Sequence, residues 1–228
     1  MIVRSSKIVS FVLALFVLPT LPVLADWEFQ NPYPTGNNMN SVWCYSANNA
    51  FAVGEDGMVL HYDGSNWSSM NSGTTSNLYG AWGSGPEDVF AVGINGTIVH
   101  YDGTSWSATT SGTDPWYSVW GSGPNDVFAV GDDGKILHYD GSNWSSMNSG
   151  TTSNLYSVWG SGPEDVFAVG QYGTILHYDG SNWSTMADSG SNLYSVWGSG
   201  PEDVFAVGYS GTIVHYDGTS WSAMTSGT

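Results

Sequence analysis

Apolar runs and turn-forming residues alternate along this chain in a pattern that recurs from Ser41 to Thr228. In the second copy, four short runs rich in Val, Ile, Phe, Tyr and Trp are separated by Gly, Pro, Asp and Ser, which predicts four β-strands. The predicted strands are residues 79–82, 88–93, 97–101 and 105–109. Asn-Gly and Asp-Gly dipeptides connect the last three strands and favour type I′ hairpin turns.

The four-strand unit occurs five times. The tryptophan of its first predicted strand recurs every 38 or 39 residues, at Trp43, Trp82, Trp120, Trp159 and Trp197. The strands are apolar on both faces, as sheets with neighbours on both sides require. Four antiparallel strands with a period near 40 residues are typical of a propeller blade. We therefore expect an all-β fold, a five-bladed β-propeller of four-stranded antiparallel blades over residues 41–228.

The first 40 residues precede the repeats. Residues 1–25 begin with Arg4 and Lys7, continue as an apolar run and end in small residues, which predicts a cleaved signal peptide. The mature chain would start at Asp26 and be secreted or periplasmic. Residues 26–40 resemble the end of a repeat, with Trp27 in the place of a fourth-strand tryptophan. This segment either closes the last blade or forms an extra edge strand, and such an edge also makes a homo-oligomer a candidate assembly.

Charge limits the choice of partners. Removal of residues 1–25 leaves a single lysine, no arginine and all 20 acidic residues. Nucleic acids and anionic membranes are excluded as partners because they require clustered basic residues. The one cysteine, Cys44, stands where the other four repeats have glycine, and we interpret it as drift within one repeat.

The repeat VWGSGPEDVFAVGxxGTILHYDGSNW, which covers residues 41–228, resembles a family of secreted bacterial β-propeller repeat proteins. It is more loosely similar to the Asp-box repeats of bacterial neuraminidases, although Asp102 is followed directly by Gly103, which departs from the spacing of that box. This resemblance implies a structural hairpin and a propeller fold. Neuraminidases hold the sugar carboxylate with arginines, which the mature chain lacks. Five-bladed lectin propellers are similar in architecture only.

Each repeat carries one histidine at the same position: His61, His100, His138, His177 and His215. Equivalent positions on separate blades are too far apart to share a metal, so we predict that each imidazole is hydrogen-bonded within its own blade. The acidic pairs Glu55-Asp56 and Asp132-Asp133 fall short of the six to eight oxygens that calcium takes, and we interpret them as solvated turns. No metal, cofactor or catalytic residue is therefore assigned, and the protein is not expected to be an enzyme.

Differences between the repeats are concentrated in two loops. The turn between the second and third strands and the loop from the fourth strand to the next blade vary, whereas the other connections hardly change from the second repeat onward. In a propeller these two loops open on one face, and loops on a rigid scaffold commonly carry recognition. Neutral drift at turn tips is the alternative interpretation. The candidate ligand-binding residues on this face are Asp56, Asn95, Asp133, Gln171, Tyr172 and Tyr209.

These observations favour a non-catalytic binding module whose partner is an unknown protein or glycan. A lectin-like carbohydrate binder with one shallow site between each pair of blades is the alternative. A glycoside hydrolase is the third hypothesis. It is disfavoured because every conspicuous carboxylate recurs in several blades, whereas a catalytic centre needs two carboxylates at one defined separation.

Overall fold

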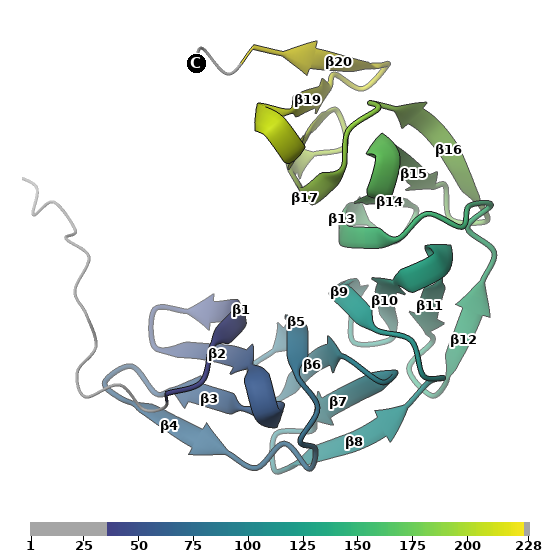
Figure 1. Ribbon diagram of the computed structural model, residues 1–228. Helices are drawn as coiled ribbons and strands as arrows, with labels where there is room; N and C mark the ends of the chain where they lie inside the picture. Colours follow the sequence, from purple (N-terminus) through teal and green to yellow (C-terminus); the bar gives the residue numbers. More distant parts are fainter. Residues whose placement is uncertain (1–35, 226–228) are drawn as a thin grey trace, which may run out of the picture. The chain divides into compact units, whose positions relative to one another are not determined.

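The computed structural model describes residues 36–225, which form five separate four-stranded antiparallel sheets, one per repeat. The expected five-bladed all-β propeller is confirmed. Each sheet has its strands in sequence order, and the sheets follow one another along an arc with the first strands on the inner side and the fourth strands on the outer side (Figure 1). Among the described residues, no helix is long and apolar enough to cross a membrane.

The strand bounds repeat with the same regularity as the sequence. The first strands are β1 (Met39–Ser46), β5 (Leu78–Gly85), β9 (Trp116–Gly123), β13 (Leu155–Gly162) and β17 (Leu193–Gly200). The second strands are β2 (Asn49–Gly54), β6 (Asp88–Gly93), β10 (Asp126–Gly131), β14 (Asp165–Gly170) and β18 (Asp203–Gly208). The third strands are β3 (Val59–Tyr62), β7 (Thr97–Tyr101), β11 (Ile136–Tyr139), β15 (Thr174–Tyr178) and β19 (Ile213–Tyr216). The fourth strands are β4 (Trp67–Met70), β8 (Trp106–Thr110), β12 (Trp144–Met147), β16 (Trp183–Asp188) and β20 (Trp221–Met224).

The tip between the second and third strands is a tight turn. In four blades it is a single 3₁₀ turn: η1 (Glu55–Gly57), η2 (Asp132–Gly134), η3 (Gln171–Gly173) and η4 (Tyr209–Gly211). The backbone is nevertheless alike in all five blades, because the second and third residues of every tip have φ of 51–58° and 67–84°, as a type I′ turn requires. The turn after the third strand does not fit the type I′ prediction. There Gly103 has φ of 87° but Asp102 has no positive φ, and the Asp102 side chain instead accepts the N–H groups of Thr104 and Ser105.

The hydrophobic cores lie between blades. Four clusters of buried residues each combine side chains from two consecutive blades. At each junction a first-strand tryptophan packs against a glycine of the next blade, so closely that a β-carbon at Gly160 would lie 2.6 Å from Cη2 of Trp120. Trp116, at the position where three of the other repeats have leucine, fills a buried packing position. Both sheet faces of the three inner blades are apolar because each of these blades contributes to two cores, whereas the first and last blades contribute to one each.

The two ends of the series do not cover each other. Val42 on the first blade is 63 % exposed, and Trp197 on the last blade is 62 % exposed. The fourth strand of the last blade is β20, which pairs with β19. The predicted signal peptide and the Trp27 segment lie outside the described residues, and the roles proposed for them stay predictions.

Candidate functional site

The six residues selected as candidate ligand contacts all lie at the tips between second and third strands. Asp56, Asn95, Asp133 and Tyr172 occupy the second position of their tips, where φ lies between 51° and 58°, and all four are exposed. Gln171 and Tyr209 occupy the first position, where Gln171 is half-buried and Tyr209 is exposed. The six residues are therefore distributed over the five blades at equivalent places.

Asparagines of the loop from the fourth strand to the next blade accept hydrogen bonds from two neighbouring tips. Asn192, just before β17, accepts the Tyr172 N–H with its side-chain Oδ1 at 2.9 Å and the Tyr209 N–H with its backbone oxygen at 2.8 Å. Asn77 makes the same pair of contacts between the first and second tips, and Asn154 between the third and fourth. The two variable loops therefore touch, and Asn192 binds the backbone N–H groups of both Tyr172 and Tyr209.

A ladder of tyrosines runs across the same end of four blades. Tyr79, Tyr117, Tyr156 and Tyr194 are the second residues of β5, β9, β13 and β17, and consecutive ring centroids are 6.0, 5.6 and 5.8 Å apart. The ladder is tied to the tips because the Tyr117 hydroxyl donates to Oδ1 of Asp132 in η2 at 2.7 Å. The first blade lacks this tyrosine and has Asn40 in its place, whose amide donates to the Leu78 carbonyl.

The most exposed part of this face is at the junction of the fourth and fifth blades. Tyr172, Tyr194 and Tyr209 are 63 %, 50 % and 64 % exposed, and Tyr194 continues the ladder next to Asn192. Tyr172 adopts a left-handed φ of 58°, a conformation that costs a non-glycine residue about 1–2 kcal/mol. A bulky ring at a strained and exposed position contributes little to packing. The same conformation recurs at this position in the other four blades, so the turn imposes the φ, and the feature particular to Tyr172 is the exposed ring. We call these three residues the tyrosine cluster.

The environment of the ladder is acidic. Burial raises the pKa of the Tyr117 hydroxyl, and the hydrogen bond to Asp132 raises it further, so this hydroxyl stays protonated. Burial also raises the pKa of Tyr156, with a smaller contribution from Tyr194. Lys135 is the single basic residue among residues 36–225 apart from histidines, and it pairs with Asp114. A ligand of this face therefore meets neutral phenols and carboxylates.

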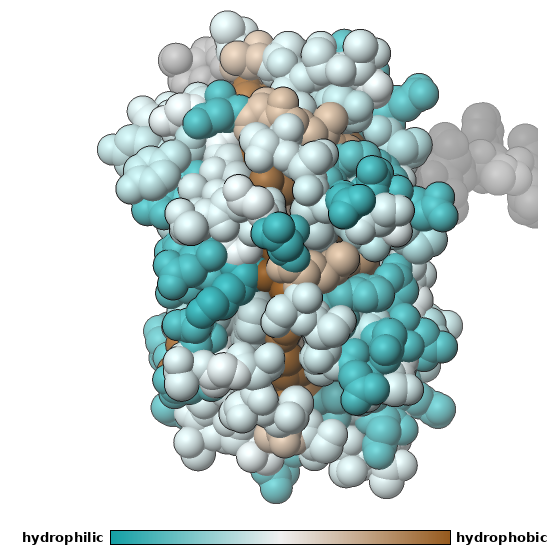
Figure 2. All heavy atoms as spheres, turned by 90° about the vertical axis from the view of Figure 1, so that its right-hand side faces the viewer, coloured by the Kyte–Doolittle hydropathy of each residue, from teal (hydrophilic) through white to brown (hydrophobic). Residues whose placement is uncertain are grey.

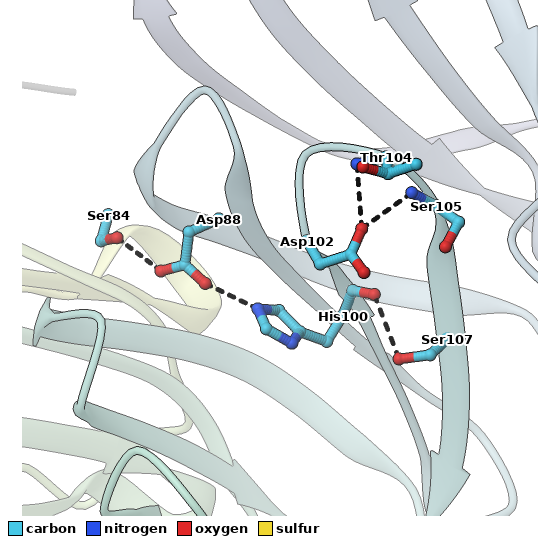
Figure 3. A network of polar contacts seen from close by, with 7 residues as sticks. All are labelled: Ser84, Asp88, His100, Asp102, Thr104, Ser105 and Ser107. Atoms are coloured by element: carbon cyan, nitrogen blue, oxygen red, sulfur yellow. Dashed lines mark hydrogen bonds and ion pairs between the residues drawn. The ribbon is translucent and has the colours of Figure 1, made fainter.

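The histidine partner that the sequence left open is the aspartate that begins the second strand. His100 Nε2 lies 2.6 Å from Oδ1 of Asp88, whose other oxygen accepts the Ser84 hydroxyl, and the ring stacks on Phe90 with centroids 4.1 Å apart (Figure 3). The third, fourth and fifth blades repeat the histidine–aspartate contact at 2.6–2.8 Å. The prediction that each imidazole is hydrogen-bonded within its own blade holds in these four blades.

This Ser–Asp–His network is built for structure. In a catalytic triad the imidazole lies between the carboxylate and the hydroxyl and removes the hydroxyl proton. Here the carboxylate lies between the other two groups, so Ser84 has no base and both oxygens of Asp88 are occupied. Within residues 36–225, no three metal-ligating side chains converge to hold an ion.

The first blade departs from the pattern. Asn49 stands where the other blades have the aspartate, and both Asn49 Oδ1 and His61 Nε2 are buried without a hydrogen-bond partner. Here the prediction of a satisfied histidine is wrong. The ring still stacks on Phe51 at 4.6 Å, so packing holds it although the polar contact is missing.

Grooves run between neighbouring blades on the outer side. One of about 400 Å³ lies between the second and third blades, lined by Ile98, His100, Tyr139, Asn143 and Trp144. A second of about 380 Å³ lies between the fourth and fifth blades and includes Trp221, whose indole N–H is buried without a partner. On the side shown in Figure 2, apolar residues form a narrow band with hydrophilic residues on both sides.

Comparison with known proteins adds information on the fold. No protein family and no curated protein matches the sequence. A solved structure described as YCF48 bound to D1 peptide is similar, with a TM-score of 0.63 and 17 % identity over 83 % of this chain and 69 % of that one. YCF48 from Cyanidioschyzon merolae is similar with a TM-score of 0.64 and 17 % identity, over 86 % of this chain and 75 % of that one. These likenesses establish a propeller fold.

Sequence reasoning selected the tips but missed the residues that connect them. Asn192 lies in the variable loop, but at a position that is asparagine in three of the four loops between blades, and the ladder tyrosines follow two residues later. These positions change little between repeats. A search for variable positions passes over them for that reason. The signal that marks them is the recurrence of an asparagine two residues before a tyrosine at the start of three first strands.

Proposed function

We propose that this protein is a non-catalytic interaction module that binds an extended segment of a partner protein across the tyrosine cluster and ladder. The observation that carries the proposal is the group of three exposed tyrosines around Asn192, continuous with the ladder at 5.8 Å. Tyrosines provide large contact area at low entropic cost and are enriched where proteins recognise one another. The similar protein described as bound to the D1 peptide supports a peptide as the class of ligand.

The charge of the face indicates which peptide chemistry fits. Carboxylates of Asp132 and Asp133 lie at the third tip, beside the ladder, and the mature chain has 20 acidic residues against one lysine. Lysine or arginine side chains of a partner would be attracted to these carboxylates and to the tyrosine faces. An acidic segment would be repelled. We therefore expect a basic, extended ligand rather than an acidic one.

A peptide array tests this directly. Basic, neutral and acidic peptides with matched aromatic content are probed with the wild-type chain, and binding peptides are titrated in solution. Tyr172→Ala combined with Tyr209→Ala should weaken binding of a basic peptide about 5- to 30-fold, since each exposed cation–π contact contributes about 0.5–1 kcal/mol. Tyr45→Ala is the matched control, because Tyr45 is 56 % exposed. It lies in the first blade at the position of Ser84, near the connection between the first and second strands and away from the tips. This substitution should leave the affinity for the peptide unchanged. Equal loss in both variants, or preference for acidic peptides, would refute the proposal.

A lectin-like function is the second candidate, and the grooves between blades favour it. The groove between the fourth and fifth blades is lined by Trp221 and the groove between the second and third blades by Trp144, and aromatic rings of this kind can stack on a sugar. A glycan array separates the two hypotheses. Sugar binding that survives loss of Tyr172 and Tyr209 would favour the grooves, whereas the absence of any sugar signal eliminates the lectin.

We also propose that the module acts outside the cytoplasm. The charged start, apolar run and small residues of positions 1–25 support export. N-terminal sequencing of the exported protein should start at Asp26, and a sequence starting at Met1 would contradict this.

A further inference from the structure

The junctions between blades share one steric arrangement. The tryptophan of each first strand projects onto a glycine of the next blade. A β-carbon added at Gly83, Gly121, Gly160 or Gly198 would lie 2.6–2.8 Å from Cη2 of the tryptophan before it. Real β-carbons essentially never approach other atoms this closely. Glycine at these four positions leaves room for the tryptophan of the preceding blade, and also for a backbone oxygen of its own blade that would lie 2.6–2.8 Å from the same β-carbon.

Within residues 36–225, the last blade presents the projecting half of this junction without a partner. Trp197 is 62 % exposed and Val207 is 43 % exposed, whereas the equivalents of Val207 in the other blades (Val53, Val92, Val130 and Val169) are fully buried by the following blade. The first blade presents the receiving half. Val42 is 63 % exposed, whereas its equivalents Val119, Val158 and Val196 are 5–6 % exposed under the preceding blade. The two end surfaces are thus halves of a contact that the chain already makes four times.

One residue distinguishes the receiving surface of the first blade from the four receiving surfaces inside the molecule. The receiving strand of the first blade has Cys44 at the position of the four glycines, and its pairing partner Ala50 keeps the register of the other blades. A β-carbon at this position would overlap the ring of an incoming Trp197 in the geometry of the existing junctions. Since a close-packed interface cannot absorb such an overlap without a shift, the first blade is a poor receiver.

We propose that the exposed face of the last blade, Trp197 with Val207, is a docking surface for another propeller blade of this repeat type that carries glycine opposite Trp197. Cys44 blocks the first blade of a second copy from taking that place. The chain is thereby kept from joining head to tail, a contact that would otherwise propagate into open chains. The four junctions inside the molecule show what this partner blade must have: an apolar receiving surface and a glycine opposite the tryptophan.

The test uses two chains that cannot assemble with themselves. The wild-type chain keeps Trp197 but has the blocked first blade. The probe, Cys44→Gly with Trp197→Asp, has an open first blade but no projecting tryptophan. Mixed under reducing conditions after export and purification, they should form a one-to-one complex in sedimentation experiments. The matched control, Cys44→Ala with Trp197→Asp, removes the thiol but keeps the β-carbon. It should bind about 5- to 150-fold more weakly, the range expected for overpacking by one carbon.

Each result has a definite meaning. Failure of the glycine probe to bind the wild-type chain overturns the proposal. This failure is the result expected if another part of the chain covers Trp197. Equal binding of the glycine and alanine probes shows that Cys44 is not the block and also overturns it. Circular dichroism confirms that the probes fold. If Cys44→Gly disturbs folding, Cys44→Gly with Tyr45→Ser restores the Gly-Ser pair of the other repeats and carries the same expectation.

Discussion

Gly160→Ala is the most direct test of how the blades are held together. Gly160 lies in β13 of the fourth blade, and an added β-carbon would lie 2.6 Å from Cη2 and 2.8 Å from Cζ3 of Trp120 in the third blade. Ordinary contact begins near 3.4 Å, so two atoms of the ring would have to move. Overpacking of this size costs about 1–3 kcal/mol. For a chain of this length that lowers the thermal midpoint by about 2–12 °C.

The assay is thermal unfolding followed by circular dichroism, with Gly162→Ala as the matched control. Gly162 lies in the same strand with no atom within 4 Å of an added β-carbon, so its substitution should be neutral or slightly stabilising. The backbone oxygen of Asp165 would also be 2.7 Å from the Gly160 β-carbon, and a double-mutant cycle with Trp120→Ala separates the two contacts. Most of the loss should disappear when Trp120 is truncated. If Gly160→Ala unfolds at the same temperature as Gly162→Ala, the steric account of the junction is wrong.

Two further predictions concern the polar network and the turns. Asn49→Asp should stabilise the chain by about 1 kcal/mol, measured by urea unfolding, because the carboxylate at this position contacts the histidine Nε2 in the other four blades, whereas Asn49 Oδ1 and His61 Nε2 do not pair. Asp88→Asn should destabilise the chain, and no change in either variant would contradict the role of the pair. Hydrogen bonds from backbone N–H groups lower the pKa of Asp63, Asp102, Asp140, Asp179 and Asp217 below the ordinary value of 3.8. Because these carboxyl groups bind protons less readily in the folded state, their stabilisation is complete above 3.8 and declines as the pH falls through that value and below. The thermal midpoint should therefore drop between about pH 4 and pH 2, less steeply after Asp179→Asn, and a midpoint independent of pH would contradict this.

Much of the fold could be predicted because the same pattern of apolar strands and turn-forming residues occurs five times in the sequence. The strands of residues 88–93 and 97–101 have the predicted bounds. The first strand is longer than predicted, extending over Leu78–Gly85, because its glycine-rich end still pairs with the second strand through a bulge. The Asp102 turn was assigned to the wrong class because its aspartate uses the side chain, and not a positive φ, to close the hairpin.

The candidate site was only partly predictable. Variation between repeats identified Tyr172 and Tyr209, but it could not show that Asn192 holds them together or that Tyr194 stands beside them. These relations depend on residues that change little between repeats and on contacts between blades about 20 residues apart in the sequence. Likewise, the histidine needed a partner 12 residues away, whose identity depends on the pairing of β6 with β7.

The sequence by itself determined the blade: local propensity, turn residues and two-faced apolar strands act within about 40 residues and therefore appear in the repeat. Only the tertiary structure decided what happens between blades. It showed that the cores are shared by neighbouring sheets, that each tryptophan requires a glycine across the junction, and that Cys44 breaks that rule in the first blade. The physical reason is that steric fit between separate sheets depends on distances between side chains, and a pattern of residue types along one strand does not contain those distances.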